Sequence, residues 1–171
     1  MTFINFSCDN IIMSANLNAQ ANPINAESIL SVHRILFFDY SSKKDALLAL
    51  AENLAAAPQV KNSKELSTEI LKREELMSTA IGFGIAIPHV RLSSVTDLVV
   101  SVGISRTDIV DFYPMDDEPV RLVFMIAAAG NQHAYYLQTL SWFSNRLKNK
   151  ELRDSLLQAK TEQEVYEMLI K

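Results

Sequence analysis

The segment 120–128 is the feature of this sequence that most narrows the possible folds. Its apolar residues occupy both alternating sets of positions: Val120, Leu122, Phe124 and Ile126 in one set, and Val123, Met125 and Ala127 in the other. A strand that is apolar on both faces is typical of a central strand covered on both sides. The sequence therefore predicts a sheet that lies between two layers.

The segments around this strand predict helices as the covering layers. Further strands are expected at 34–38, 85–87 and 98–104. Amphipathic helices are expected after Ser42, after Asn62 or Ser63, and after Asn131, followed by two shorter ones at 150–159 and 161–170. Ser42 and Thr161 each have a carboxylate three residues later, which is capping-box spacing. Strands separated by helices indicate an α/β domain.

The first 23 residues differ from the rest. They contain five Asn and a single charged residue, Asp9, and their apolar residues show no sustained period. We expect an N-terminal extension over 1–23, poorly ordered in part, and one folded domain over 24–171.

Composition argues against several function classes. Hydrophobic residues make up 49% of the chain, charged residues 21%, and the net charge is -4 without a long basic run. A nucleic-acid partner is therefore not expected, since such proteins carry a basic face. No apolar run approaches the ~20 residues that span a bilayer, and the N-terminus lacks signal-peptide character, so a cytoplasmic location without membrane insertion is expected. Cys8 is the only cysteine, which excludes a disulfide framework.

His89 is the strongest candidate for chemistry. Gly82 and Gly84 lie upstream, a short apolar strand leads in, and Pro88 holds the preceding residue extended, so the strand is expected to deliver His89 at its end. Loops at strand ends are where α/β proteins place chemistry. Arg91 adds a cation two residues later. The histidines do not have zinc-ligand spacing, and neither a metal nor a cofactor is expected.

The stretch from Arg73 to His89, with its Ile87-Pro88-His89 ending, resembles the signature of the type-2 IIA components of the phosphoenolpyruvate-dependent sugar phosphotransferase system. This is the fructose/mannitol class, which includes the nitrogen-regulatory IIA proteins. The resemblance runs from about Ile24 to Lys171. It implies a mixed β-sheet flanked by helices, and an α/β (α+β) fold of the mannitol/fructose-specific IIA kind. Phe83 stands where many relatives carry Asn, and Ala80 where many carry Gly.

The resemblance also implies the site residues. His89 matches the phosphorylated histidine, Arg73 the arginine that helps hold the phosphoryl group, and His133 the second active-site histidine at the start of a later helix. Physical chemistry agrees: guanidinium suits phosphate, and a helix N-terminus favours an anion. Which imidazole nitrogen of His89 carries the group stays open at this point.

Other neighbours of His89 are weaker candidates. The hydroxyls of Ser78 and Thr79 and the guanidinium of Arg91 are candidates for binding phosphoryl oxygens. From position alone, Phe83 and Val90 are candidates for an apolar rim that contacts partners. The acidic residues of 111–118 favour a solvated turn over a docking surface for a basic partner; they are Asp111, Asp116, Asp117 and Glu118.

The function that the resemblance implies is that of a phosphotransferase working through a phosphohistidine. The implied donor is the phosphocarrier HPr, and the acceptor is a IIB domain, in the transport branch together with a membrane IIC partner. The alternative is a regulatory, nitrogen-type IIA protein whose phosphorylation state controls binding to other proteins. A hydrolase using His89 is disfavoured, because the chain has no Gly-x-Ser-x-Gly elbow and no Gly-rich phosphate loop with Lys.

Overall fold

The structure is a computed structural model that describes residues 24–114 and 116–171. The expected extension over 1–23 lies outside the described residues. The helices are α2 (Ala26–Ile29), α3 (Lys43–Ala55), α4 (Ser63–Leu76), α5 (His133–Arg146), α6 (Lys150–Gln158) and α7 (Glu162–Ile170), with 3₁₀ turns η1 (Val32–Arg34) and η2 (Val110–Phe112). The strands are β1 (Ile35–Phe38), β2 (Ala80–Gly82), β3 (Ile85–Ala86), β4 (His89–Leu92), β5 (Val99–Ile109) and β6 (Val120–Ala129).

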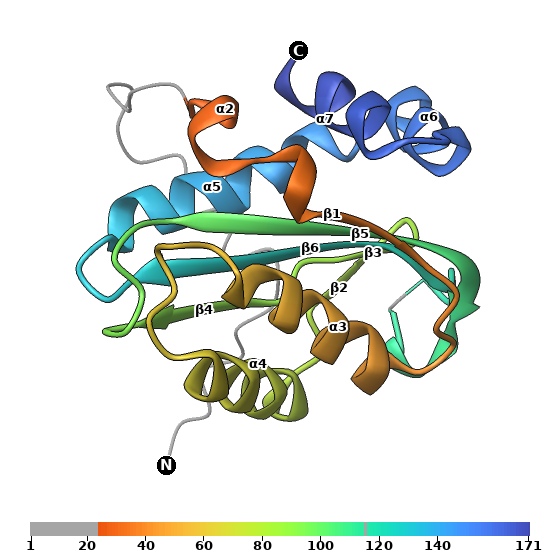
Figure 1. Cartoon of the computed structure of the whole chain (residues 1–171). Coiled ribbons are helices and arrows are strands. Elements are labelled where there is room, and N and C mark those ends of the chain that lie inside the picture. The colour runs from red at the N-terminus through yellow and green to blue at the C-terminus, as the bar shows by residue number, and fades with distance from the viewer. Residues whose placement is uncertain (1–23, 115) are drawn as a thin grey trace.

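The strands form one six-stranded mixed sheet in the order β1-β5-β6-β3-β2, with β4 also paired to β6. The β1–β5, β3–β6 and β4–β6 pairs are parallel, whereas β5–β6 and β2–β3 are antiparallel. Helices α3 and α4 cover one face, and α2, α5, α6 and α7 cover the other (Figure 1). The predicted mixed sheet flanked by helices is therefore confirmed.

Strand β6 is the central strand that its sequence predicts. Its alternate side chains join two separate cores: Phe124 and Ile126 pack under α5, while Val123 and Met125 pack under α3 and α4. All four are fully buried. Apolar side chains on both faces thus hold the two helical layers against one strand.

Helices α3, α4 and α7 begin where their capping residues predict. The side chains of Ser42, Asn62 and Thr161 accept hydrogen bonds from the backbone N–H groups of Asp45, Glu65 and Glu164. Helix α5 begins at His133 after Gln132, whose side chain makes no cap bond and instead links Ala129 to Asp97. The helix start predicted near Asn131 is therefore confirmed, with Gln132 as the residue at the N-cap position.

The segment 85–92 forms two strands, β3 and β4, which Ile87 and Pro88 separate. Strand β3 pairs with Leu122 and Val123 of β6, and β4 pairs with Ile126 onward, so both lie along the same side of β6. Pro88 has no N–H to donate, but its carbonyl accepts from Ile126 N at 2.9 Å. His89 consequently opens a strand, and the expectation that it ends one is wrong.

Candidate functional site

His89 is the first residue of β4, and its ring points to the face covered by α5. Because side chains alternate along a strand, Val90 points to the opposite face, where it is buried under α3 and α4. Arg91 returns to the face of His89 and is exposed. The interruption at Pro88 thus sets which side chains of β4 share a surface with the imidazole.

The backbone fixes the protonation pattern of the His89 ring. Nδ1 lies 2.6 Å from the carbonyl oxygen of Ile87. A carbonyl oxygen only accepts hydrogen bonds, so Nδ1 carries the proton and Nε2 of the neutral ring keeps its lone pair. Of the two nitrogens left open by the sequence, Nε2 is the one available as a nucleophile.

Burial keeps this imidazole neutral. Removal from water lowers the pKa of His89 to about 4, outweighing the hydrogen bond to Ile87, which raises it; the charge of Arg73 lowers it further. At neutral pH the ring is therefore unprotonated at Nε2. A neutral imidazole is the nucleophilic form.

Two guanidinium groups converge here from different elements. Arg73 lies in the last turn of α4, donates to Met77 O at 2.9 Å, and influences the pKa of both His89 and Tyr136. Arg91 lies over the Tyr136 ring at 5.6 Å and donates to Gly130 O at 3.4 Å. Among the described residues, neither has an ion-pair partner. Both positive charges are thus available to an anion beside His89.

The ring of α5 that meets His89 belongs to Tyr136. The two rings make an edge contact with centroids 5.8 Å apart. Burial raises the pKa of the Tyr136 hydroxyl to about 12, although Arg73 and Arg91 both lower it, so the hydroxyl is a proton donor at neutral pH. The sequence interpretation missed Tyr136; its position three residues after His133, on the same helix face, was the signal that could have found it.

His133 occupies the first turn of α5, as predicted, but its side chain is exposed. It lies one helical turn before the residue that contacts His89. The ring that contacts His89 is thus that of Tyr136, and the role of His133 as a second histidine of the site stays a prediction.

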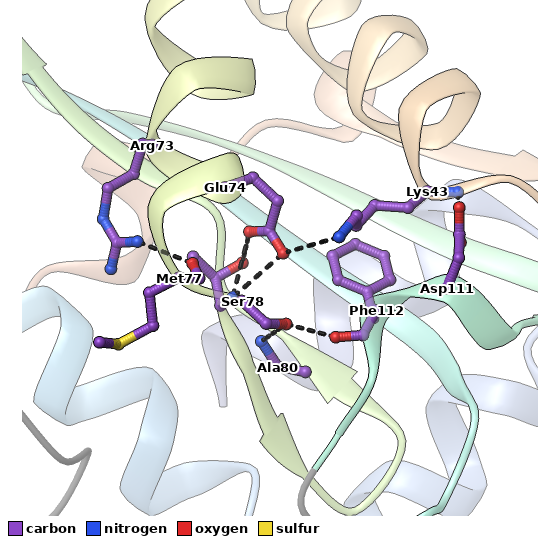
Figure 2. Close-up of polar contacts among 9 residues, drawn as sticks. Lys43, Arg73, Glu74, Met77, Ser78, Ala80, Asp111 and Phe112 are labelled. Carbon is purple, nitrogen blue, oxygen red and sulfur yellow. Dashed lines mark hydrogen bonds and ion pairs between the residues drawn. The ribbon is translucent and has the colours of Figure 1, made fainter.

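The hydroxyls of Ser78 and Thr79 are engaged elsewhere. Ser78 donates to the carbonyl of Phe112, as Figure 2 shows, and Thr79 donates to a carboxylate oxygen of the buried Glu74 at 2.6 Å. Neither proton is free for a phosphoryl oxygen in this structure. Both side chains instead hold the turn between α4 and β2.

The two residues expected to form an apolar rim do not lie beside the imidazole on its face. Phe83 sits in the tight turn between β2 and β3, with positive φ, near the start of β6, and its ring lies 4.9 Å from the guanidinium carbon of Arg153 in α6. Val90 is buried on the opposite face of the sheet. The exposed apolar side chains near Arg73 are instead Leu76 (83% exposed) and Met77 (50%), at the end of α4.

Two of the acidic residues of 111–118 accept hydrogen bonds from nearby backbone N–H groups. Asp111 accepts from Lys43 N at the start of α3, and Asp116 accepts from Phe83 N at 2.6 Å and from Glu118 N at 3.3 Å. These bonds agree with the prediction of a turn rather than a docking surface.

The described residues contain no group of three or more His, Cys, Asp or Glu side chains arranged to hold a metal ion. Within 24–114 and 116–171, no helix combines the length and apolar character needed to cross a membrane.

Residues 28–171 match the model of a known family, described as phosphoenolpyruvate-dependent sugar phosphotransferase system, EIIA 2. The chain is 34% identical over 142 residues to the fructose-specific EIIABC component of Bacillus subtilis, which covers 82% of this chain but only 22% of that longer protein. It is 37% identical over 129 residues to a nitrogen regulatory protein of Klebsiella oxytoca, covering 75% of this chain and 78% of that one.

Solved structures show the same fold. The nitrogen regulatory protein IIA-Ntr of Neisseria meningitidis superimposes with a TM-score of 0.76 at 26% identity, covering 84% of this chain and 97% of that one. The mannitol IIA enzyme of Escherichia coli, in complex with phosphorylated IIB, gives a TM-score of 0.69 at 25% identity, with coverages of 82% and 96%.

Proposed function

Because the chain belongs to the EIIA 2 family of the phosphoenolpyruvate-dependent sugar phosphotransferase system, we propose that it carries a phosphoryl group on Nε2 of His89 between two proteins. The observation that carries this proposal is the bond from Nδ1 to the Ile87 carbonyl. It leaves a neutral Nε2 with a free lone pair, close enough to Arg73 for that charge to lower the pKa of the imidazole.

The proposed transfer step exchanges one N–P bond for another. Nε2 attacks the phosphorus of a phosphohistidine on the donor, and the donor's N–P bond breaks, leaving its electron pair on the donor imidazole. The His89 ring, substituted at both nitrogens, gains positive charge. The Nδ1–H bond to Ile87 O then becomes charge-assisted and strengthens. Transfer to the acceptor reverses these changes.

Arg73, Arg91 and Tyr136 form the proposed phosphoryl-binding group. The two guanidiniums supply charge and N–H donors for the phosphoryl oxygens, and the protonated Tyr136 hydroxyl supplies a neutral donor. All three act by positioning and by charge stabilisation, which is what phosphoryl transfer needs from a protein. His133, exposed one helical turn before Tyr136, is the proposed second histidine of the site.

The proposed donor is phosphorylated HPr and the proposed acceptor is a IIB protein. The acceptor follows from the relative whose structure holds IIA with phosphorylated IIB. In the transport branch, the IIB protein feeds a sugar entering through a IIC partner, as the fructose-specific relative suggests.

The second candidate is a regulatory protein whose phosphorylation state controls binding to other proteins. The similarity to nitrogen regulatory proteins, in sequence and in structure, favours it. Both candidates use the same His89 chemistry and differ in what receives the group.

Intact mass spectrometry tests the proposal. The native chain and His89→Ala are incubated with phosphoenolpyruvate, enzyme I and HPr. We expect one acid-labile phosphoryl group on the native chain alone. No gain with a competent HPr would overturn the carrier function and leave a binding role.

A second step separates the two candidates. The phosphorylated native chain is isolated and mixed with a IIB protein of the fructose or mannitol class. Transfer to IIB supports transport; retention of the group on His89, with hydrolysis only, supports the regulatory candidate.

A further inference from the structure

The carboxylate of Glu74 is buried at the end of α4, and its hydrogen bonds go to Thr79 and not to the imidazole. Glu74 is the residue after Arg73 in α4 and is only 4% exposed. A buried carboxylate is costly unless hydrogen bonds or a cation compensate it. The hydrogen-bond partners of the Glu74 carboxylate therefore show which part of the chain it holds in place.

Those partners are the turn that follows α4. The backbone N–H of Thr79 donates to both carboxylate oxygens at 3.1 and 3.2 Å, and the Thr79 hydroxyl donates to Oε2 at 2.6 Å. Lys43 approaches from α3, with Nζ at 3.7 Å from Oε1 (Figure 2). One carboxylate thus fixes both the backbone and the side chain of Thr79.

The chain of bonds continues to the imidazole. The Thr79 carbonyl accepts from Ile87 N at 3.0 Å, and the Ile87 carbonyl accepts from His89 Nδ1 at 2.6 Å. The same turn anchors the guanidinium of Arg73 through Met77 O. The position of the turn therefore sets the nucleophile and the cation together.

A second set of contacts fixes the turn from the side of η2. Ser78 donates to the Phe112 carbonyl, and Ala80 N donates to Ser78 Oγ at 3.3 Å. On the far side, Asp111 accepts from Lys43 N at 2.7 Å (Figure 2). Lys43 and the turn are thus linked both through Glu74 and through η2.

From this continuous network we propose that Glu74 is a positioning residue for His89. Its carboxylate holds Thr79, Thr79 holds Ile87, and Ile87 holds the imidazole as the tautomer that presents Nε2. The inference rests on the proposed phosphoryl transfer at His89, but the tautomer it concerns exists before any transfer.

The first measurement is the tautomer of unphosphorylated His89, read from the ¹⁵N shifts of its ring by NMR. Native protein is compared with Glu74→Ala and with Glu75→Ala, a matched control at the exposed neighbouring carboxylate. We expect the Nδ1–H form in the native chain and the control, and a mixture of tautomers in Glu74→Ala. An unchanged tautomer in folded Glu74→Ala would overturn the inference.

The second measurement is single-turnover transfer from phosphorylated HPr. Because Glu74 is buried, we expect the saturating rate in Glu74→Ala to fall by about tenfold to a hundredfold, as a displacement near 1 Å would cause. The half-saturating HPr concentration is expected to stay at the native value. A change confined to half-saturation would mean that Glu74 serves docking, contrary to the proposal.

Thr79 keeps the inference testable where Glu74→Ala fails to fold. Thr79→Val removes the hydroxyl at nearly constant volume, and Thr79→Ser restores it. We expect a smaller loss of rate and of the Nδ1–H form in the valine variant and recovery in the serine variant. If the valine and serine variants behave alike, the proposed chain of bonds from Glu74 through Thr79 to His89 is overturned.

Absence of transfer in the native chain would instead count against the proposed function. The tautomer data would still decide the role of Glu74.

Discussion

At the scale of single residues, the site depends on one imidazole being kept neutral and turned by a backbone carbonyl. Ile87 O determines which nitrogen is free, and burial keeps the ring unprotonated. Tyr136 contacts the ring, Arg73 acts on its pKa, and Arg91 lies over Tyr136, so a hydroxyl and two positive charges gather at the site. Each contribution is separable by substitution.

The Tyr136 hydroxyl is expected to matter for transfer and not for folding. Tyr136→Phe keeps the ring edge against His89 and removes one donor. Since a hydrogen bond to a charged group contributes about 1.5–3 kcal/mol, single-turnover transfer should slow by about tenfold to a hundredfold. Rapid-quench kinetics measure the rate, with Tyr135→Phe as the neighbouring control. If Tyr136→Phe transfers at the native rate, the Tyr136 hydroxyl does not belong to the proposed phosphoryl-binding group.

The depressed pKa of His89 predicts a loss of stability in acid. Its pKa is about 4 in the folded chain against an ordinary 6.5, so the unfolded chain binds the proton more readily between these values. The neutral, buried imidazole thus contributes fully to the free energy of unfolding above about pH 6.5. This contribution decreases as the pH falls below 6.5 and is lost as the pH falls through about 4. At about 1.4 kcal/mol per pKa unit, the loss is about 3 kcal/mol.

Urea denaturation at a series of pH values measures this loss. The native chain is compared with His89→Gln, which has no titrating group at this position. The difference in free energy of unfolding between the two should shift against the native chain as pH falls from 6.5 to 4. A constant difference would contradict the neutral, buried state of the imidazole.

At the scale of elements, the glycines reveal their closest packing at Gly103 of β5, where Phe38 of β1 and Leu50 of α3 both approach the backbone. A Cβ on Gly103 of β5 would lie 2.6 Å from Phe38 Cε1 and 3.1 Å from Leu50 Cδ1. Leu50 is fully buried in α3, so the collision cannot be relieved toward solvent. Glycine here leaves room for the Phe38 ring of β1 and for Leu50 of α3 against β5.

Gly103→Ala is therefore expected to destabilise the fold by about 1–3 kcal/mol through overpacking. Gly130, after β6, is the matched control because a Cβ there meets nothing within 4 Å. Urea denaturation of the two alanine variants gives the comparison. Equal stabilities would show that the α3–β5 contact adjusts freely.

Much of the element order was predictable because its causes are local. The caps at Ser42, Asn62 and Thr161 are satisfied by residues only three positions away. The two-sided apolar pattern of β6 likewise predicts its central place. Strand β2 was missed because three residues carry too little periodicity to indicate a strand.

The site was predicted in part, and its errors share one cause. The charge of Arg73 acts on His89 in the structure, whereas Val90 and Phe83, expected beside the imidazole because they are near it in sequence, lie elsewhere. Val90 follows His89 in a strand, so its side chain points to the other face of the sheet. Phe83 lies in the turn between β2 and β3, which is farther along the sheet from His89. Tyr136 was missed because only the docking of α5 decides which residue of its first turns meets β4.

At the scale of the whole molecule, the proposed carrier function requires that two partners bind in turn at one exposed surface. Leu76 and Met77 are the exposed apolar residues at the end of α4, next to the Arg73 guanidinium. Apolar area beside a charged centre is what a partner can bury on docking.

Leu76→Ser is expected to weaken docking without altering the chemistry. The half-saturating concentration of phosphorylated HPr should rise by about threefold to tenfold, because the variant loses the burial of a leucine side chain in the complex, which costs on the order of 1 kcal/mol. The saturating rate and the pKa of His89 should match the native chain. Leu48→Ser, an exposed leucine on α3, is the control. Parallel effects in both variants would indicate general destabilisation instead.

The pairing of β4 with β6 has a consequence for the protein during its synthesis. His89 lies opposite Ile126 of β6, and Tyr136 comes later still, in α5. A growing chain that has released His89 from the ribosome therefore lacks the strand and the helix that bury its ring. Until both have emerged, the imidazole is an ordinary solvated histidine. The buried setting of the imidazole is thus completed only after synthesis has passed α5.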